Sequence, residues 1–336
     1  MTAAPSATFL MCVESGYIES QLPIAVEGIR KFGGRLANAP VLVVTPRFGP
    51  TLTRVTQRKL ADLGATYVRR NLRNSWDWYV YMNKALAAAL GEELATTDQI
   101  LWMDTDCLIV SDPEPLLLGP GEDIACCSVD KNVGSSGPDD PYEAYWKALA
   151  DHYGLAVDRL PWVETAHDRR RVRFRLHSGV YSFRRGSGVG RSFVEDMESM
   201  LASRIAFSRK LPYPGDDVAL AFSIVRRNLK WRILPMSVNY EMIPTSEIYK
   251  RDDARKAHVL HFHHALGVPD SAAWFLRELE TFRPDVADWL RSRVPIDYKV
   301  GGFHRTVVRR VLRTLRSRRQ LLHMESCRIM VPDGAV

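Results

Sequence analysis

Hydrophobic and polar residues form blocks of two lengths along the first hundred residues. The short, almost uninterrupted apolar blocks lie at residues 7–13, 39–45, 65–70 and 99–103. The longer blocks, in which apolar residues recur at helical spacing, lie at residues 21–32, 52–64 and 78–90. Short apolar runs are typical of strands that are buried on both faces. The order therefore predicts an α/β fold with a mostly parallel central sheet flanked by helices.

Two aspartates end the fourth predicted strand. In "QILWMDTDCLIV", Asp104 and Asp106 follow the apolar run, at the edge where parallel sheets bind ligands. Residues i and i+2 of an extended chain share a face, so the two carboxylates need a cation or a proton between them. Mg²⁺ or Mn²⁺ fits, since a hard ion held by few protein oxygens keeps positions open for phosphate oxygens. The alternative is a structural role, because Asp is also common at turns and helix caps.

Four histidines in "HVLHFHHALG" offer a nitrogen ligand for the same ion. His261 lies at the predicted end of a strand, and imidazole is a good ligand for manganese. For His258, His263 and His264 we favour structural roles with hydrogen-bonded rings.

Four motifs in a fixed order resemble a known family. They are "MDTDCLIV", "LHSGVYSF", "YPGDDVALAF" and "HVLHFHHALG". Together they resemble the metal-dependent glycosyltransferases of the GT-A fold, most nearly family 8, over about residues 7–280. The resemblance implies a nucleotide-sugar donor, usually a UDP-sugar, and Mn²⁺ (or Mg²⁺) held by Asp104, Asp106 and His261. It also implies transfer with retention of configuration to a hydroxyl of a glycan, a glycolipid or another acceptor.

The sequence departs from the family at the groups expected to be catalytic. His177 stands where the family usually has Asn, and Asp216 and Asp217 stand where it has Asp-Gln. A carboxylate here would orient the acceptor or stabilise the sugar, or one of the pair would cap the next helix. Arg173 and Arg175 alternate with apolar residues on the side of His177. They lie near the departing diphosphate or are solvated on an edge strand, and we favour the second.

The remaining donor contacts follow from the resemblance alone. It places them at Glu14, Tyr17, Asn83, Lys84 and Thr105, together with Asp104. Tyr17 would stack on the nucleobase, or would only cover the edge of the sheet. Lys84 would contact the donor, or would be an ordinary surface lysine.

The positive charge is concentrated in one segment. The formal net charge is +7, and residues 301–323 contain seven arginines but no Lys, Asp or Glu, so the rest of the chain is neutral. Apolar residues recur between the arginines at helical spacing, at Val308, Val311, Leu315 and Leu322. This pattern favours a helix on an anionic membrane surface, with packing on the body or an oligomer contact as the alternative. No nucleic acid is expected, because no aromatic stacking platform accompanies the arginines.

These observations divide the chain into a catalytic domain at 1–295 and a basic amphipathic tail at 296–336. No apolar run reaches the roughly 20 residues that cross a bilayer, and the first residues lack the pattern of a signal peptide. We expect a cytoplasmic protein, peripheral at the inner membrane face if the tail binds there. The five cysteines include no CxxC pair and are expected to be reduced.

Two other classes of protein share parts of this pattern. Phosphatases of the haloacid dehalogenase type also have Asp-x-Asp after a strand. Their motif usually opens the chain and continues Gly-Thr, whereas Asp106 is followed by Cys107. A non-catalytic protein that binds nucleotide-sugars is the other alternative.

Overall fold

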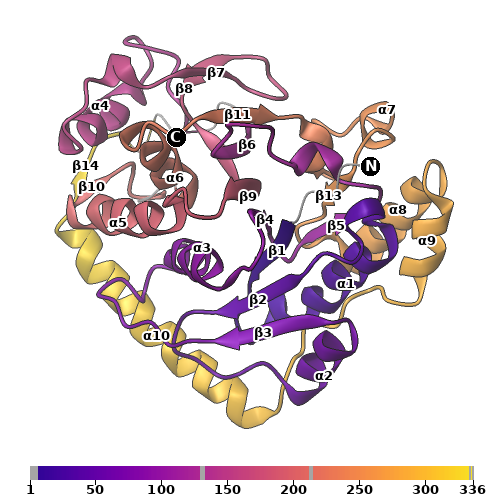
Figure 1. Ribbon diagram of the computed structural model, residues 1–336. Helices are drawn as coiled ribbons and strands as arrows, with labels where there is room; N and C mark the ends of the chain where they lie inside the picture. The colour runs from indigo at the N-terminus through magenta and orange to yellow at the C-terminus, as the bar shows by residue number, and fades with distance from the viewer. Residues whose placement is uncertain (1–6, 129–132, 212–214, 333, 335–336) are drawn as a thin grey trace.

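The computed structural model describes residues 7–128, 133–211, 215–332 and 334. Its centre is a seven-stranded sheet in the order β11-β6-β9-β4-β1-β2-β3 (Figure 1). The strands of this sheet are β1 (Ala7–Cys12), β2 (Val41–Thr45), β3 (Ala65–Arg69), β4 (Gln99–Met103), β6 (Ile124–Ser128), β9 (Leu176–Arg184) and β11 (Trp231–Leu234). Only β9 runs against its neighbours β4 and β6, and the other pairs in this sheet are parallel. The predicted mostly parallel α/β sheet is therefore confirmed.

Helices cover both faces of the sheet. The α-helices of the described residues are α1 (Tyr17–Phe32), α2 (Arg54–Asp62), α3 (Met82–Leu94), α4 (Glu143–His152), α5 (Val189–Ala202), α6 (Asp216–Arg226), α7 (Arg251–Ala254), α8 (Pro269–Glu280), α9 (Pro284–Arg291) and α10 (Phe303–Glu325), the last of which runs along the outside of the molecule. Short 3₁₀ helices lie at Gly34–Leu36, Glu114–Leu116, Val157–Arg159, Met236–Val238 and Ala265–Gly267.

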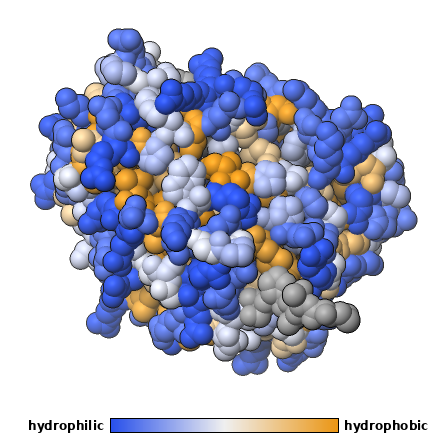
Figure 2. Space-filling model, turned by 45° about the horizontal axis from the view of Figure 1, so that its top comes forward, coloured by the Kyte–Doolittle hydropathy of each residue, from blue (hydrophilic) through white to orange (hydrophobic). Residues whose placement is uncertain are grey.

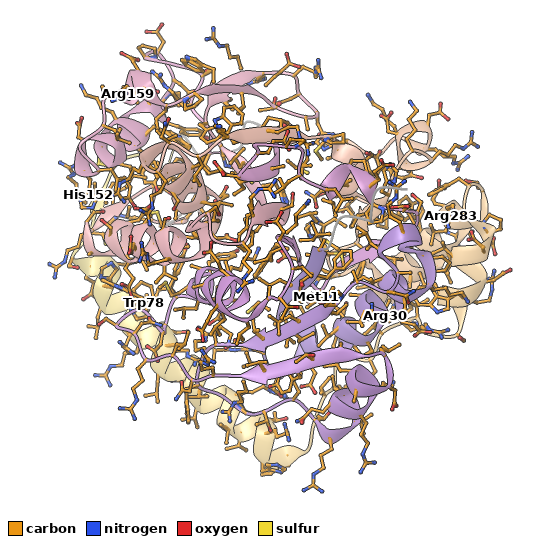
Figure 3. All side chains as sticks on the ribbon, viewed as in Figure 1. Met11, Arg30, Trp78, His152, Arg159 and Arg283 are labelled. Carbon is orange, nitrogen blue, oxygen red and sulfur yellow. The ribbon has the colours of Figure 1, made fainter. Side chains whose placement is uncertain are left out.

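Two hydrophobic cores result, one on each face. Phe9 and Met11 of β1 pack in the core that includes α1, α8 and α9, and Met11 lies in the middle of the molecule (Figure 3). Leu10 points to the opposite core, which α3, α5 and α6 cover. This alternation is the period of two that a strand buried on both faces requires. At the surface, hydrophobic residues reach solvent near the middle of one face, among hydrophilic neighbours (Figure 2).

Short strands outside the large sheet tie distant segments together. They are β5 (Cys107–Ile109), β7 (Trp162–Glu164), β8 (Arg171–Arg173), β10 (Ile205–Ala206), β12 (Tyr240–Glu241), β13 (Val259–His261) and β14 (Arg328–Ile329). A three-stranded sheet has the order β12-β13-β5, and β14 pairs with β10. The strand that follows the two aspartates is therefore held by a strand from the last third of the chain.

Some element boundaries differ from the prediction. The helix expected at 78–90 begins at Met82, because Trp78–Tyr81 form turns in which the Tyr79 N–H bonds to the Trp76 carbonyl. Among the described residues, no helix is long and apolar enough to cross a membrane. The five cysteines are free thiols, as expected.

Candidate active site

The segment that carries the two aspartates is fixed between two sheets. Asp104 and Asp106 follow β4 directly, at the carboxyl end of that strand, as predicted. The Asp104 N–H donates to the Gly179 carbonyl of β9 at 2.8 Å, and the Phe262 N–H donates to the Asp106 carbonyl at 3.0 Å. The backbone therefore holds both carboxylates at the junction of the large sheet and the β12-β13-β5 sheet.

Asp106, His261 and His263 form a cluster that can hold a metal ion. Their ligand atoms lie within 4.8 Å of one another. Asp106 Oδ1 is 3.3 Å from His261 Nε2, and Asp106 Oδ2 is 4.0 Å from His263 Nδ1. The two imidazole rings stack, with centroids 4.0 Å apart. One carboxylate and two imidazoles are a donor set that suits Mn²⁺.

Residues near β12 orient both imidazoles. His261 Nδ1 donates to Asn239 Oδ1 at 3.1 Å, and His263 Nε2 donates to Glu241 Oε2 at 3.2 Å. Each ring therefore keeps its other nitrogen facing Asp106. Metal-binding histidines are commonly oriented by such a hydrogen bond from the nitrogen that does not bind the metal. The hydrogen bond from His263 lowers the pKa of Glu241 to about 2. His263 itself has a φ of 49°, a left-handed conformation that non-glycine residues rarely adopt.

The charges of this cluster support one another. Burial opposes ionisation of Asp106, yet the neighbouring His261 and His263 bring its pKa below the usual value. Burial also opposes a charged His261, but the carboxylates of Asp106 and Asp104 raise its pKa overall. The cluster is therefore built for a positive charge beside Asp106.

Lys84 joins Asp104 to a second carboxylate. Its Nζ lies 2.8 Å from Asp104 Oδ2 and 3.0 Å from Asp216 Oδ2. Asp104 Oδ1 accepts a further hydrogen bond from Trp102 Nε1 at 3.0 Å. Although burial acts against its charge, Asp104 and Asp216 raise the pKa of Lys84 well above its usual value. With 18% of its side chain exposed, Lys84 is a largely buried cation between two carboxylates, and not an ordinary surface lysine.

Asp216 and Asp217 are the first two residues of α6. The position before them, where a cap would stand, is Gly215 with a φ of 116°, so neither aspartate is the N-cap. Asp216 Oδ2 accepts from Ser178 Oγ at 2.5 Å. Asp217 Oδ2 lies 2.8 Å from the Arg175 guanidinium. Burial, with a contribution from Asp216, raises the pKa of Asp217 to about 6, and Arg175 opposes this rise.

The two arginines beside His177 are buried, contrary to our expectation of solvated side chains. Arg173 and Arg175 are 2% and 7% exposed. Arg173 lies 2.7 Å from Glu143 Oε1, and Arg175 pairs with Asp217. Arg173 ends β8, whose only partner among the described strands is β7, and Arg175 directly precedes β9, an inner strand of the large sheet. Their burial therefore comes from the packing around these ion pairs.

His177 lies against the cluster of Asp106, His261 and His263. Its ring centroid is 5.5 Å from that of His261. The Gly179 N–H donates to His177 Nδ1 at 2.8 Å, so the neutral ring carries its proton on Nε2. Burial, with the nearby positive charges, lowers the pKa of His177 well below its usual value. A Cβ at Gly179 would be 2.5 Å from one His177 ring atom and 3.1 Å from His261, so only glycine fits here.

The other predicted donor contacts lie in less open positions. Glu14 pairs with the buried Arg47 at 2.6 Å. Thr105 is 5% exposed, and its hydroxyl bonds to Gln21 Oε1. Asn83 is also 5% exposed.

Tyr17 is the most exposed of the predicted donor contacts. It is 49% exposed, and its ring touches those of His264 and Tyr298. Burial and the charge of Asp106 raise its pKa, so it lies near the cluster.

The structure adds residues that the sequence analysis set aside or missed. His263 was assigned a structural role, whereas it lies in the cluster with Asp106 and His261 that could hold a metal ion. Asn239 and Glu241 were not considered, although their spacing of two residues matches that of His261 and His263 on the adjacent strand. Tyr213 and Pro214 of the "YPGDD" motif lie outside the described residues.

Comparison with known proteins agrees with this architecture. The structure superposes on an active-site mutant of LgtC with a TM-score of 0.50 and 13% identity, covering 85% of this chain and 100% of that one. The galactosyltransferase LgtC with donor and acceptor sugar analogs gives a TM-score of 0.49 with the same identity and coverage. The apo bifunctional glycosyltransferase WbbM gives 0.46 at 11% identity, covering 87% of this chain and 52% of that one. The match to the LgtC mutant, at a TM-score of 0.50, shows a fold of the GT-A type.

The sequence itself gives the family. No curated protein has a significant sequence match to the chain. The family model of the Rhodobacterales glycosyltransferase domain matches residues 9–228, which include both Asp104 and Asp106 but neither His261 nor His263. That match spans more than half of the chain, so the protein belongs to the Rhodobacterales glycosyltransferase domain family.

Proposed function

We propose that the protein transfers a sugar from a nucleotide-sugar donor, a UDP-sugar, to a hydroxyl group of a glycan or glycolipid. Mn²⁺ or Mg²⁺ would assist the transfer, and the configuration at the anomeric carbon would be retained. We assign the chemistry to a catalytic domain at 1–295. The cytoplasmic face of the membrane is the location that we propose for it.

One observation carries this proposal. Two charged clusters meet at the carboxyl end of β4, where open α/β sheets bind their ligands. The first is Asp106 with His261 and His263, and the second is Lys84 between Asp104 and Asp216. Because Asp104 and Asp106 are separated by one residue, a ligand that spans the clusters meets a metal-binding group and a buried cation together.

The donor set fits a divalent cation. Asp106, His261 and His263 would hold it, and Asp104 is a further candidate ligand that Lys84 and Trp102 already bond. The mixture of carboxylate and imidazole favours Mn²⁺ over Mg²⁺, which prefers oxygen ligands. When bound, such an ion neutralises the negative charge that develops on a departing diphosphate.

The side chains around this group have distinct tasks in the proposal. Lys84 supplies a fixed positive charge, and the Nε2–H of His177 donates a hydrogen bond to an oxygen of the donor. Asp216, beside Lys84, and Asp217, with its raised pKa, are the carboxylates available to the sugar or to the acceptor hydroxyl.

The nucleotide end of the donor would lie at the other predicted contacts. Tyr17, half exposed, would stack on the nucleobase. Glu14 and Thr105, in loops, and Asn83, in the first turn of α3, would shape the region that receives the donor.

Donor turnover tests the proposal. Purified protein is incubated with a panel of nucleotide-sugars, with Mn²⁺ or with a chelator, and the release of nucleoside diphosphate is measured. We expect release from a UDP-sugar that requires the metal, and loss of about 100-fold or more in Asp106→Asn. The matched control is Asp62→Asn, which removes an exposed carboxylate at the end of α2 and keeps full turnover.

Three results would contradict the proposal. Hydrolysis of phosphate esters without nucleotide-sugar turnover would indicate a phosphatase. Binding of UDP without turnover, seen as a metal-dependent rise in melting temperature, would indicate a binding protein. A product whose anomeric configuration is opposite to that of the donor, measured by NMR, would refute the proposed retention but not the sugar transfer.

A further inference from the structure

An exposed tyrosine lies in the turn that leads into α3. Trp78 and Tyr79 are buried in the second core, whereas the next two residues, Val80 and Tyr81, are exposed. Tyr81 is 41% exposed and belongs to neither hydrophobic core of the described residues. An aromatic ring that packs in no core is available for contact with a ligand.

Tyr81 lies beside the charged groups at the centre of the candidate active site. The Lys84 Nζ is 6.0 Å from the centroid of the Tyr81 ring, and this ammonium group bridges Asp104 and Asp216. Burial raises the pKa of Tyr81, and the charge of Asp216 raises it further, against the opposing charge of Lys84. Asp217 and Asp104 act in the same direction as Asp216. The ring is therefore close to both carboxylates that we assign to the sugar or to the acceptor hydroxyl.

The backbone fixes the position of this ring relative to Lys84. Tyr81 directly precedes α3, and the Lys84 N–H donates to the Tyr81 carbonyl at 3.0 Å. The Met82 N–H donates to the Tyr79 carbonyl at 3.2 Å. The buried ring of Tyr79 packs against that of Tyr81, with centroids 5.6 Å apart and planes at 67°. The turn therefore supports the Tyr81 ring before any ligand binds.

A second exposed tyrosine lies near a different carboxylate of the site. After burial, the charge of Asp106 contributes most to the raised pKa of Tyr17, whereas the charge of Asp216 does so for Tyr81. We assign Tyr17 to the nucleobase and Asp106 to the ion beside the diphosphate. A donor bound in this way leaves Tyr81 for the other substrate.

The surroundings of Tyr81 fit a sugar. A pyranose has a face of C–H bonds and an edge of hydroxyl groups, so it can pack on an aromatic ring while it hydrogen-bonds to carboxylates. Ligand sites generally combine apolar contacts with a few well-placed polar groups in this way. Asp216 and Asp217, which are 4% and 6% exposed, are polar groups of this kind. A simple alcohol or a serine side chain offers a hydroxyl without the C–H face.

We propose that Tyr81 forms an acceptor subsite, and that the acceptor is a pyranose whose C–H face lies on the Tyr81 ring. A hydroxyl of this sugar then points towards Asp216 and Asp217. Tyr81 selects and orients the acceptor and takes no part in making or breaking bonds. The inference rests on the proposed function and narrows its acceptor from any hydroxyl compound to a sugar.

Acceptor kinetics test the subsite. The full chain is assayed with a UDP-sugar, Mn²⁺ and one of several acceptors: methyl pyranosides, disaccharides, glycerol or a serine-containing peptide. Glycosylated product is measured by mass spectrometry. We expect transfer to a pyranoside and not to glycerol or the peptide. In Tyr81→Leu the acceptor KM should rise about 10-fold, because an aromatic contact with the acceptor is lost, while the donor KM should change by less than about two-fold.

Two further variants separate this contact from a structural role. Tyr81→Phe keeps the ring, so its acceptor KM should stay within about two-fold of the wild-type value. Phe303→Leu is the matched control, because it removes an aromatic ring that is 85% exposed at the start of α10 and should change neither KM. A distorted turn would also displace Lys84 and would raise the donor KM together with the acceptor KM. Loss of the acceptor contact raises only the acceptor KM.

Three results would overturn the subsite even when nucleotide-sugars are turned over. The first is a wild-type acceptor KM in Tyr81→Leu, and the second is a donor KM that rises as much as the acceptor KM. The third is transfer to glycerol or to the peptide but to no sugar. Absence of any nucleotide-sugar turnover would contradict the proposed function, and this inference with it.

Discussion

Arg175→Met perturbs the ion pair that holds Asp217 ionised. In the wild type, the pKa of Asp217 rises from an ordinary 3.8 to about 6. The folded protein therefore keeps this proton over a pH range in which the unfolded chain has lost it, and stability falls as pH rises through that range. A shift of one pKa unit corresponds to about 1.4 kcal/mol, so the free energy of unfolding falls by about 3 kcal/mol over this range.

Removing Arg175 extends this fall to higher pH. Its guanidinium lies 2.8 Å from Asp217 Oδ2, and both side chains are 9% exposed. Without the cation the pKa of Asp217 rises further, so the carboxylate ionises in the folded state only at greater cost. Breaking a buried pair typically costs about 3–5 kcal/mol. We expect a loss of this size at about pH 7.5, but only about 1 kcal/mol near pH 5, where a neutral Asp217 loses a single hydrogen bond.

Urea unfolding of both proteins at the two pH values measures this difference. Groups that titrate alike in wild type and variant contribute equally to the stability of both proteins at each pH. Their contributions therefore cancel in the difference between wild type and variant. Arg191→Met is the control, because its exposed pair with Glu195 at 3.6 Å should change stability by less than about 0.5 kcal/mol at either pH. Equal losses for Arg175→Met at both pH values would refute the reasoning, as would no loss at all.

Other predictions concern the cluster and the thiols. Gly179→Ala should lower the melting temperature and donor turnover together, since the added methyl group meets two imidazole rings; normal turnover would show that the rings can move aside. His263→Gln should weaken Mn²⁺ binding by about 10-fold or more in calorimetry, and Glu241→Gln should weaken it less, through the lost hydrogen bond; equal affinities would remove His263 from the ligand set. In the folded protein, a thiol reagent should modify Cys327 before the three fully buried cysteines, because burial raises the pKa of those three thiols; mass spectrometry of peptides reads the order.

The strand and helix order could be predicted because the periodicity is local. Each block up to residue 103 carries its own pattern, and the structure follows it in order. The start of α3 was misplaced, since Trp78 and Tyr79 are apolar but lie in turns that pack against the second core. Asp104 and Asp106 lie at the carboxyl end of β4 as predicted, because that placement needs only the strand order.

The partners of the site residues depend on contacts that the sequence does not reveal. Arg175 pairs with Asp217, a residue of another element. The alternation along residues 172–177 does not reveal this partner, and it therefore suggested that the arginines are solvated. His263 lies in the cluster with Asp106 because of the register of β12 beside β13, which sets Glu241 opposite His261. The register between strands that are distant in the sequence is a tertiary property. The spacing of the histidines alone therefore could not show which of them lies beside Asp106.

The pairing of β5 with β13 also bears on how the protein is made. β13 supplies the registered partners of Cys107, Leu108 and Ile109, directly after the two aspartates. As the ribosome releases the chain from its amino end, the aspartates emerge long before either imidazole of the cluster. A nascent chain that has been translated only as far as α6 therefore carries Asp106 without its two imidazole partners and β5 without β13. Unpaired strand edges of this kind favour aggregation of incomplete chains.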